Sequence, residues 1–378
     1  MSVDISLYVH FPFCRCKCNY CSFVSYQGRE ADIPEYIEAL KWELSLRAAG
    51  QRVNTIYFGG GTPSLLSIEQ VGEVLSAIHS FFDVDKEAEV TIEANVGTVD
   101  ETYLTGIRAL GINRLSLGVQ SLREDELVML GRIHTAEDAR AAVRFARSAG
   151  FANLNLDFLY GLPGVCTDSW RRTLAGVVEL DAEHLSLYAL TIDRRVLLGR
   201  AIEVGNLPAI DSDSVADQYE LAEDLLQEVG WHHYEISNWA KHGRECRHNI
   251  VYWQTLPYMG VGVAAHSYMD GHRFANVADV DRYLESFSCN VPLVYDLDEE
   301  IDQDLQVSEA IILGLRMNEG IDVEDFQSRF DVELPGLYGQ QIDELTNWGL
   351  LEYGEGHLRL TRRGRLLGNE VFWRLLPK

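Results

Sequence analysis

Segments with the pattern of buried strands alternate with segments of helical periodicity along the first 190 residues of the chain. The strand-like segments cover residues 5–9, 53–58, 89–93, 114–119, 153–159 and 184–190. Helical patterns lie between them, at residues 34–49, 100–110, 124–130, 136–149 and 168–180 and in a stretch after Ser67. This alternation predicts parallel βαβ units. Six such units predict an α/β fold, a partial or full (β/α) barrel whose ligands bind at the C-terminal strand ends.

The pattern changes in the second half of the chain. A helix is expected at residues 213–229 and a strand at 231–236, whereas residues 238–290 look irregular and 296–304 resemble an acidic linker. From residue 305 onward the sequence predicts several helices and a small hairpin at 350–353 and 358–360, as in a winged-helix module. We therefore expect a core barrel in residues 1–236, a connecting region in 237–304 and a small helical domain in 305–378.

The composition limits the classes of function. The 378 residues are 47% hydrophobic and 24% charged, which is typical of a globular protein. The formal net charge of −26 argues against a nucleic-acid binder, because phosphate binding needs concentrated Lys and Arg. The sequence has no recognisable secretory signal and no apolar run near the ~20 residues of a spanning helix. We expect a cytoplasmic protein, and association with a membrane surface stays open.

Four of the seven cysteines lie in one short stretch directly after the first predicted strand. Cys14, Cys18 and Cys21 have the spacing C-x3-C-x2-C, and Cys16 falls outside this pattern. Thiolates are soft ligands that suit zinc or iron–sulfur clusters. A disulfide is disfavoured by an enzyme-like chain without a signal peptide. A zinc site using all four cysteines is an alternative, although two-residue steps leave little room for a tetrahedral arrangement.

Glycines and polar residues follow the other strands. The sequence GGGT at residues 59–62 follows the second strand and allows close approach of backbone to a ligand. Glu93, Gln120 and Asp157 lie at or near the ends of the third, fourth and fifth strands. Their recurrence predicts one shared ligand at the mouth of the barrel. Arg132 is either a surface ion-pair residue or a cation that faces a carboxylate of that ligand.

The cysteine spacing resembles that of radical S-adenosylmethionine (SAM) enzymes. Four longer motifs resemble the oxygen-independent coproporphyrinogen III oxidase superfamily: YVHFPFC at 8–14, GGGTP at 59–63, GVQS at 118–121 and YGLPG at 160–164. Within it the chain is most similar to the HemW branch, on the motif HNIVYW at 248–253. The oxidases carry a further Cys two residues after the third ligand, and here that residue is Phe23. The chain departs from the family pattern at Val96, at 193–200 and in GVGVAAHS at 260–267.

The resemblance implies a radical SAM partial (β/α) barrel that holds a 4Fe-4S cluster and SAM. It makes Cys14, Cys18 and Cys21 the cluster ligands. The residues that it implies for SAM are Tyr8, Gly60, Gly61, Thr62, Glu93, Gln120, Arg132, Asp157 and, more loosely, Thr191. For heme it offers His248, which has an equally good interpretation as a hydrogen-bonded structural histidine. Tyr252 and Trp253 are candidates for an aromatic wall, and Cys246 and His266 are weaker ligand candidates.

The function that the resemblance implies is that of a heme chaperone, which binds heme and delivers it to respiratory heme proteins. A first alternative is a radical SAM enzyme that decarboxylates coproporphyrinogen III or modifies heme. The HNxxYW motif and the lack of an N-terminal extension argue against coproporphyrinogen oxidation. A second alternative is a tRNA-modifying enzyme, which the net charge of −26 disfavours.

Overall fold

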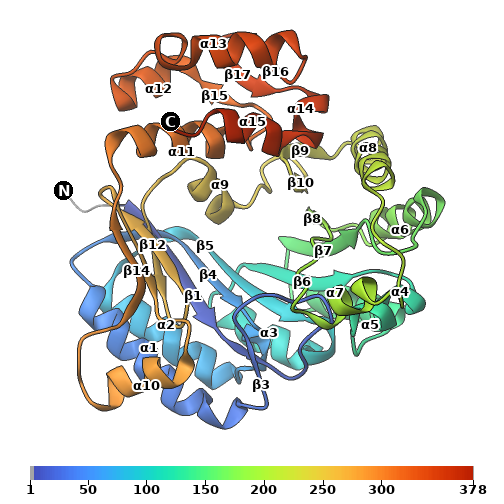
Figure 1. The fold of residues 1–378 in the computed structure, drawn as a ribbon. Coiled ribbons are helices and arrows are strands. Elements are labelled where there is room, and N and C mark those ends of the chain that lie inside the picture. The colour runs from blue at the N-terminus through green and yellow to red at the C-terminus, as the bar shows by residue number, and fades with distance from the viewer. Residues whose placement is uncertain (1–3, 378) are drawn as a thin grey trace.

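The computed structural model describes residues 4–377, and most of its strands form one large mixed sheet. The sheet has twelve strands in the order β14-β13-β12-β11-β1-β4-β5-β6-β7-β8-β10-β9. Six consecutive strands of this order are parallel: β1 (Asp4–Phe11), β4 (Arg52–Gly60), β5 (Asp83–Asn95), β6 (Arg114–Gln120), β7 (Leu154–Tyr160) and β8 (His184–Ala189). These strands confirm the predicted βαβ alternation. Because the outermost strands β14 and β9 do not pair with each other, the barrel is a partial one (Figure 1).

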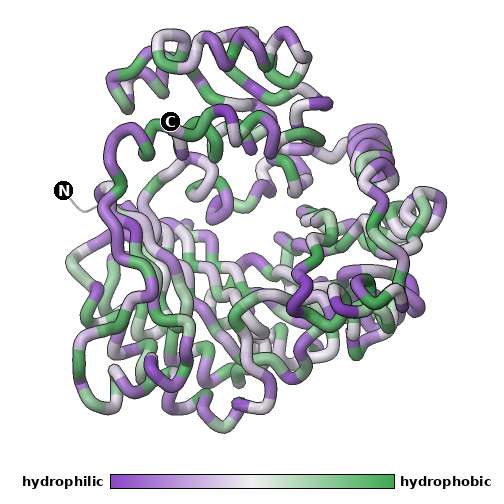
Figure 2. Tube along the Cα trace, viewed as in Figure 1, coloured by the Kyte–Doolittle hydropathy of each residue, from purple (hydrophilic) through white to green (hydrophobic). Residues whose placement is uncertain are grey.

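Helices cover the outer face of the parallel strands. They are α1 (Ile33–Arg47), α2 (Ile68–Phe81), α3 (Glu101–Ala109), α4 (Glu124–Leu130), α5 (Ala136–Ser148) and α6 (Thr167–Glu179). In Figure 2 apolar and polar residues alternate along these outer helices. Helix α2 illustrates this alternation, because Val71, Val74 and Ile78 are buried on its inner face. A capping box formed by Ser67 and Gln70 starts this helix. Each such buried side chain stabilises the fold by about 1.5–3 kcal/mol relative to exposure.

The segment expected to be irregular is instead regular. Residues 238–290 form β10 (Asn238–Ala240), α9 (Arg247–Trp253), β11 (Tyr258–Val261), β12 (His266–Met269), β13 (His272–Asn276) and α10 (Val280–Ser288). Their elements have only three to nine residues and mix His, Tyr and Gly with apolar residues, so they show no clear periodicity. The expected boundary after residue 236 falls between β9 (His232–Glu235) and β10, which pair with each other in the same sheet.

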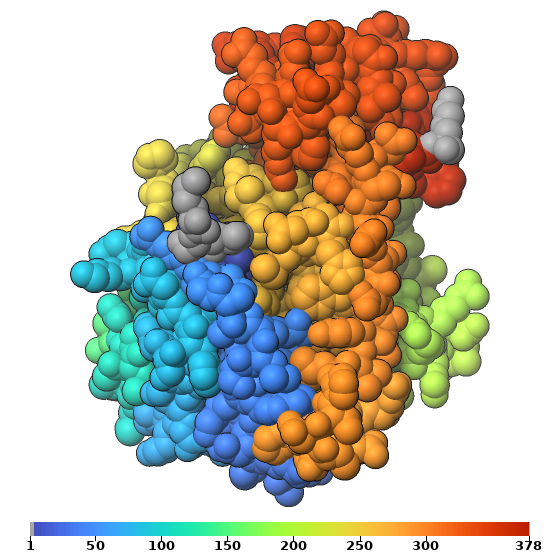
Figure 3. Space-filling view, turned by 90° about the vertical axis from the view of Figure 1, so that its left-hand side faces the viewer, coloured from blue at the N-terminus to red at the C-terminus, as the bar shows by residue number. Residues whose placement is uncertain are grey.

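The prediction of an acidic linker at residues 296–304 is also wrong. Strand β14 (Tyr295–Glu300) occupies most of it and pairs antiparallel with β13 at the edge of the sheet. Acidic side chains on an edge strand discourage further strand pairing between molecules. In the space-filling view of Figure 3 this orange edge of the sheet lies beside the blue N-terminal segment.

Residues after 302 form a compact module with its own apolar core. It contains α11 (Gln303–Gly314), β15 (Ile321–Asp322), α12 (Val323–Phe330), α13 (Leu334–Asn347), β16 (Leu351–Gly354), β17 (His357–Leu360), α14 (Arg362–Leu366) and α15 (Gly368–Arg374). The hairpin of β16 and β17 confirms the prediction to within one residue. Ion pairs join the module to Glu223 of α8 (Ser212–Glu228), with N–O distances of 3.1 Å to Arg362 and 2.8 Å to Arg365. None of the helices in residues 4–377 is long and apolar enough to cross a membrane.

Candidate functional site

A cavity of about 510 Å³ opens at the C-terminal ends of the parallel strands. Its volume falls within the roughly 300–1,000 Å³ that is usual for small-molecule sites. Eleven of the thirteen residues named from the sequence line this cavity: Cys14, Cys18, Cys21, Gly60, Gly61, Thr62, Glu93, Gln120, Arg132, Asp157 and Thr191. Tyr8 and His248 do not. Residues separated by up to 177 positions in the chain therefore meet around one space, as the strand-end argument predicts.

The cysteine loop is held in place by the rest of the protein. Cys14 belongs to a two-residue strand, β2 (Phe13–Cys14), which pairs with β3 (Tyr26–Gln27). Asn19 donates its backbone N–H to the carbonyl of Leu130 at 3.0 Å. The ammonium of Lys17 donates to the carbonyls of Phe23 and Ser25 at 3.2 and 3.3 Å. These contacts fix the loop against the end of α4 and across its own backbone.

The three patterned cysteines form no disulfide, and they line the same cavity. All seven cysteines are free of disulfides, and no three His, Cys, Asp or Glu side chains within residues 4–377 are grouped closely enough to hold a single metal ion. A 4Fe-4S cluster binds its thiolates through separate irons and spaces them more widely. Hydroxyl and guanidinium groups donate to two of the sulfurs, from Thr62 to Cys14 at 3.5 Å and from Arg132 to Cys18 at 3.3 Å. Burial raises the pKa of the Cys14 thiol, and the hydrogen bond from Thr62 opposes this rise.

The glycine loop passes close to the cysteine strand. Gly60 has a φ of 114°, and a Cβ atom there would lie 2.6 Å from the ring of His10. A Cβ atom at Gly61 would lie 2.6 Å from the carbonyl oxygen of Phe13. Both positions therefore require glycine. The N–H of Gly61 donates to the carbonyl of Phe11 at 2.7 Å, which fixes the loop directly beside the start of the cysteine motif.

Two carboxyl groups face the cavity from neighbouring parts of the sheet. Glu93 accepts hydrogen bonds from the hydroxyl of Tyr57 at 2.9 Å and from the N–H of Gly60 at 3.1 Å. Burial, and then the nearby charge of Asp157, raise the pKa of Glu93 to about 7. Burial also raises the pKa of Asp157, which accepts from Ser116 and Asn155. Two carboxyls in a polar pocket can accept from the hydroxyl or ammonium groups of a ligand.

Arg132 joins three parts of the site. Its guanidinium donates to the side-chain oxygen of Asn95 at 2.6 Å and to the carbonyl of Gly118 at 2.5 Å, in addition to the Cys18 sulfur. It makes no ion pair with a carboxylate within residues 4–377, so the surface ion-pair interpretation is wrong. Gln120 ends β6 with a φ of 71°, a left-handed conformation that is uncommon outside glycine and recurs at functional sites.

Several lining residues were not identified from the sequence. They are Asn95, Arg114, Ser116, Asn155, Ser186, Tyr188 and Asn249. Six of these seven stand two residues from another lining residue on β5, β6, β7 or β8. Since alternate residues of a strand share a face, steps of two from Glu93, Gln120 and Asp157 would have found four of them, Asn95, Arg114, Ser116 and Asn155.

Tyr8 lies beside a second cavity of about 410 Å³. Its hydroxyl is 3.1 Å from Nδ1 of His10. The second cavity shares Phe23, Gly60 and Glu93 with the first one, so the two cavities are neighbours. Its other lining residues are Tyr8, His10, Val24, Tyr252, Tyr258, Ala264 and His266.

His248 is buried, and both of its ring nitrogens contact hydroxyl groups of the protein. Its side chain is 1% exposed, its Nδ1 is 2.7 Å from the hydroxyl of Thr55, and its Nε2 is 2.9 Å from the hydroxyl of Tyr252. Its ring also stacks on Tyr57 at 5.0 Å. Burial lowers the pKa of His248 to about 3. With both ring nitrogens engaged, this arrangement favours the structural interpretation over the heme-ligand one.

Cys246 lines neither of the two neighbouring cavities. It precedes α9 and is fully buried, where its thiol lies 3.7 Å from a carboxylate oxygen of Glu89. The same carboxylate accepts from the backbone N–H groups of Arg247 and His248, and so it caps the helix. The start of the HNxxYW segment therefore serves to fix α9 against the strand starts.

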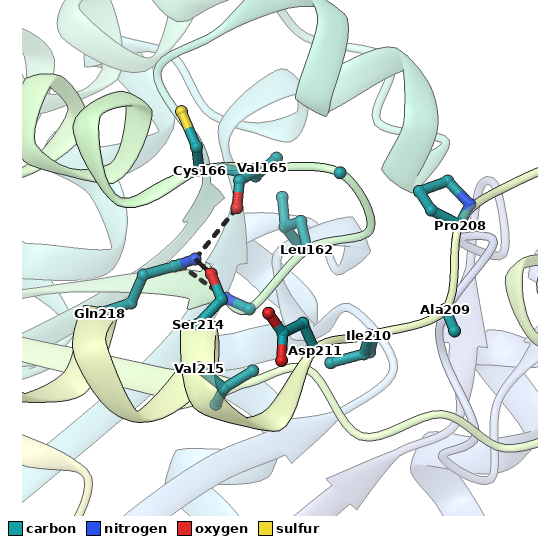
Figure 4. Close-up of a pocket in the computed structure, with 12 residues that line it drawn as sticks. Leu162, Val165, Cys166, Pro208, Ala209, Ile210, Asp211, Ser214, Val215 and Gln218 are labelled. Carbon is teal, nitrogen blue, oxygen red and sulfur yellow. Dashed lines mark hydrogen bonds between the residues drawn. The ribbon is translucent and has the colours of Figure 1, made fainter.

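A third cavity of about 250 Å³ lies between the YGLPG loop and α8. Figure 4 shows Gln218 reaching from α8 toward this loop. Its amide accepts from the N–H of Gly161 at 3.0 Å and donates to the carbonyl of Val165 at 3.1 Å and the hydroxyl of Ser214 at 3.2 Å. The side-chain amide of Gln218 thus makes three hydrogen bonds within the protein. We conclude that the YGLPG motif serves to position its loop against α8.

Family models match both parts of the chain. The model of the Radical SAM superfamily matches residues 8–175, and that of the HemN C-terminal domain matches residues 301–367. The chain is therefore a radical SAM protein with a HemN-type C-terminal domain. Its fold is also similar to that of coproporphyrinogen III oxidase (HemN) from Escherichia coli, a radical SAM enzyme, with a TM-score of 0.86 at 24% identity over 99% of this chain and 90% of the other. This likeness shows the fold alone.

Curated relatives define the family more narrowly. The chain is 34% identical to the heme chaperone HemW of Bacillus subtilis over 371 residues, which cover 97% of this chain and 98% of the relative. It is 39% identical to the heme chaperone HemW of Escherichia coli over 267 residues, which cover 69% of each. The chain belongs to the HemW family of radical SAM proteins. The resemblance drawn from the motifs is thereby confirmed.

Proposed function

We propose that the protein is a heme chaperone that holds a 4Fe-4S cluster and SAM, binds heme and delivers it to respiratory heme proteins in the cytoplasm or at the membrane surface. The observation that carries the proposal is the meeting of the three patterned thiols with the glycine loop and the carboxyls of Glu93 on β5 and Asp157 on β7 around one cavity. The nearly full-length similarity to proteins named heme chaperones supports the cargo.

The residues of the cavity divide the binding work in this proposal. Cys14, Cys18 and Cys21 hold the cluster, and Arg132 stabilises the Cys18 thiolate through its hydrogen bond. When bound, the cluster supplies one-electron chemistry to SAM. Glu93 and Asp157 accept from polar groups of SAM, and Gly60 and Gly61 let the backbone lie against it.

The remaining SAM contacts come from other strand ends. Thr62, Gln120 and Thr191 offer hydrogen-bonding groups around the same cavity. Tyr8 acts indirectly, since its ring stacks on Tyr57 at 6.1 Å and Tyr57 holds Glu93. We assign no part to nucleic acid, because the net charge of −26 opposes phosphate binding.

Gel filtration after an anaerobic heme titration tests the proposal. The cluster-reconstituted protein is titrated with heme, and its fractions are examined in the visible region. A Soret band that elutes with the protein is the expected result, together with no conversion of coproporphyrinogen III in the presence of SAM and a reductant. Free passage of heme combined with consumption of coproporphyrinogen III would contradict the chaperone function and establish the enzyme instead.

A further inference from the structure

The second cavity differs in chemistry from the one that the cysteines line. No cysteine belongs to its lining, and three tyrosines, Tyr8, Tyr252 and Tyr258, contribute to its walls. The rings of Tyr252 and Tyr258 meet edge to face at a centroid distance of 4.7 Å. Phe23 belongs to the shared boundary of the two cavities and is 70% exposed. Aromatic walls and an exposed apolar lip suit a flat, largely apolar ligand.

Two histidines line this cavity, and they differ in what their rings contact. The Nδ1 of His10 is 3.1 Å from the Tyr8 hydroxyl, and its Nε2 is 3.1 Å from the carbonyl oxygen of Val24. His266, at the start of β12, is exposed, and its ring makes no hydrogen bond to any residue between 4 and 377. His266 is therefore the histidine of this cavity whose nitrogens are available to a ligand.

The surroundings of His266 favour the form of the ring that binds metals. The partial burial of its ring, followed by the positive charge of Arg273, lowers the pKa of His266. The ring is accordingly neutral near pH 7 and carries a free lone pair, as a heme ligand must. Arg273 itself is engaged by Glu299 and Glu309, and Tyr268 is the partner of Arg273 across the β12–β13 pair.

We propose that the second cavity is the heme site and that the imidazole of His266 is an axial ligand of the heme iron. The inference rests on the proposed function, because it assumes that heme is the cargo. Binding forms one Fe–N bond from a ring lone pair and releases a water ligand, without change of oxidation state. The macrocycle then lies along Tyr252 and Tyr258, and the shared residues Gly60 and Glu93 place it next to the cluster cavity.

Replacement of His266 tests the assignment. Hemin is titrated into the full-length, cluster-reconstituted wild type, His266→Ala and, as a matched control, His272→Ala, whose ring is on the next strand outside the cavity and pairs with Asp298. The expected result is a wild-type Soret band retained in His272→Ala. In His266→Ala we expect a shifted band, an affinity at least about tenfold lower, and recovery of the wild-type spectrum on addition of free imidazole.

A second variant separates ligation from folding. His266→Met keeps a side chain of similar size and offers a thioether, so it should give a heme spectrum with altered axial ligation. An unchanged spectrum and affinity in both His266 variants would overturn the assignment while leaving heme binding by the wild type intact. Failure of the wild type to retain hemin would instead overturn the proposed function, and the assignment with it.

Discussion

At the scale of single residues, Arg132 shows how the site depends on contacts between segments that are far apart in the sequence. One guanidinium holds the sulfur of Cys18, the amide oxygen of Asn95 and the carbonyl of Gly118. These groups belong to the cysteine loop, to the end of β5 and to β6. A cation with several fixed donors is the side chain suited to this task, and lysine is not an equivalent replacement.

The cluster assignment predicts a contrast between two neighbouring cysteines. Cys18→Ser removes one of the three patterned thiols and should abolish the brown chromophore and the bound iron after reconstitution. Cys16→Ser changes an exposed thiol outside the pattern and should retain both. Iron analysis and visible spectra of the two variants check this. Equal iron content in both would show that the ligand assignment is wrong.

The raised pKa of Glu93 predicts a dependence of stability on pH. The pKa rises from 4.5 to about 7 on folding, so this residue contributes stability that is fully present below pH 4.5 and is lost as pH rises through 7. Glu93→Gln keeps an acceptor and does not titrate. Between pH 4.5 and 7.5 the wild type should therefore lose about 1–3 kcal/mol relative to Glu93→Gln, measured by urea denaturation of the metal-free proteins. A difference that is constant with pH would refute the buried, proton-binding state.

The sequence identified the site residues that stand at strand ends and missed others on the same strands. Glu93, Gln120 and Asp157 were found because each is a polar residue at or near the C-terminal end of an apolar strand pattern. Asn95 and Arg114 were missed because a single polar residue within or beside a strand is usually explained by a turn or by the surface. Only the sheet register, which pairs Arg114 with Thr91, shows that its side chain lies inside the barrel.

At the scale of elements, strand pairing and side-chain hydrogen bonds shape the cysteine loop. Its two ends are joined by the pairing of β2 with β3, and the ammonium of Lys17 donates to the carbonyls of Phe23 and Ser25. This order lowers the conformational entropy that ligation would otherwise have to overcome. The loop can thus present three thiols toward one side.

A substitution at Lys17 measures the value of this order. Lys17→Met should loosen the loop by about 1 kcal/mol, and the cluster should then be lost to a chelator about fivefold faster. Arg15→Met, on the exposed side of the same loop, is the control and should behave as the wild type. Chelator kinetics followed by the loss of visible absorbance provide the measurement. Identical rates for Lys17→Met and the wild type would show that the hydrogen bonds of Lys17 do not stabilise the loop.

Long periodic elements could be predicted from the sequence, whereas short ones could not. The six parallel strands and most outer helices carry enough apolar residues at regular spacing to be recognised. Strands β10 to β13 have three to five residues each, and β10 and β11 are specified by pairing with β8 and β1, which are far away in the sequence. No local pattern encodes that pairing. The acidic strand β14 looked like a linker because only its pairing with β13 identifies it as a strand.

At the scale of the whole molecule, the C-terminal module and α9 lie against the barrel on the side of the strand starts (Figure 1). Helix α9 is tied there by Arg247, which donates to the carbonyl of Glu87 at 2.8 Å, and it contacts α11 of the module. The cysteine loop belongs to the opposite ends of the strands. Cluster chemistry and module packing are thus assigned to different ends of the sheet.

The docking of the module predicts unequal effects for two adjacent acids. Glu223→Ala removes a carboxylate that is 7% exposed and faces Arg362 and Arg365, so the free energy of unfolding should fall by about 2–3 kcal/mol. Asp224→Ala removes an exposed partner of Arg362 and should cost less than about 1 kcal/mol. Chemical denaturation, with limited proteolysis near residues 296–304, measures both. Equal losses would contradict docking through Glu223.

The central claim, that this protein carries heme to an acceptor, is tested most directly by heme transfer. Heme-loaded protein is mixed with a heme-free respiratory heme protein, the two are separated, and the Soret absorbance of each is recorded over time. The account predicts that the band moves to the acceptor faster than heme is released to a heme scavenger in a parallel sample. Transfer that is no faster than release to the scavenger would show passive loss of heme and would contradict the chaperone function.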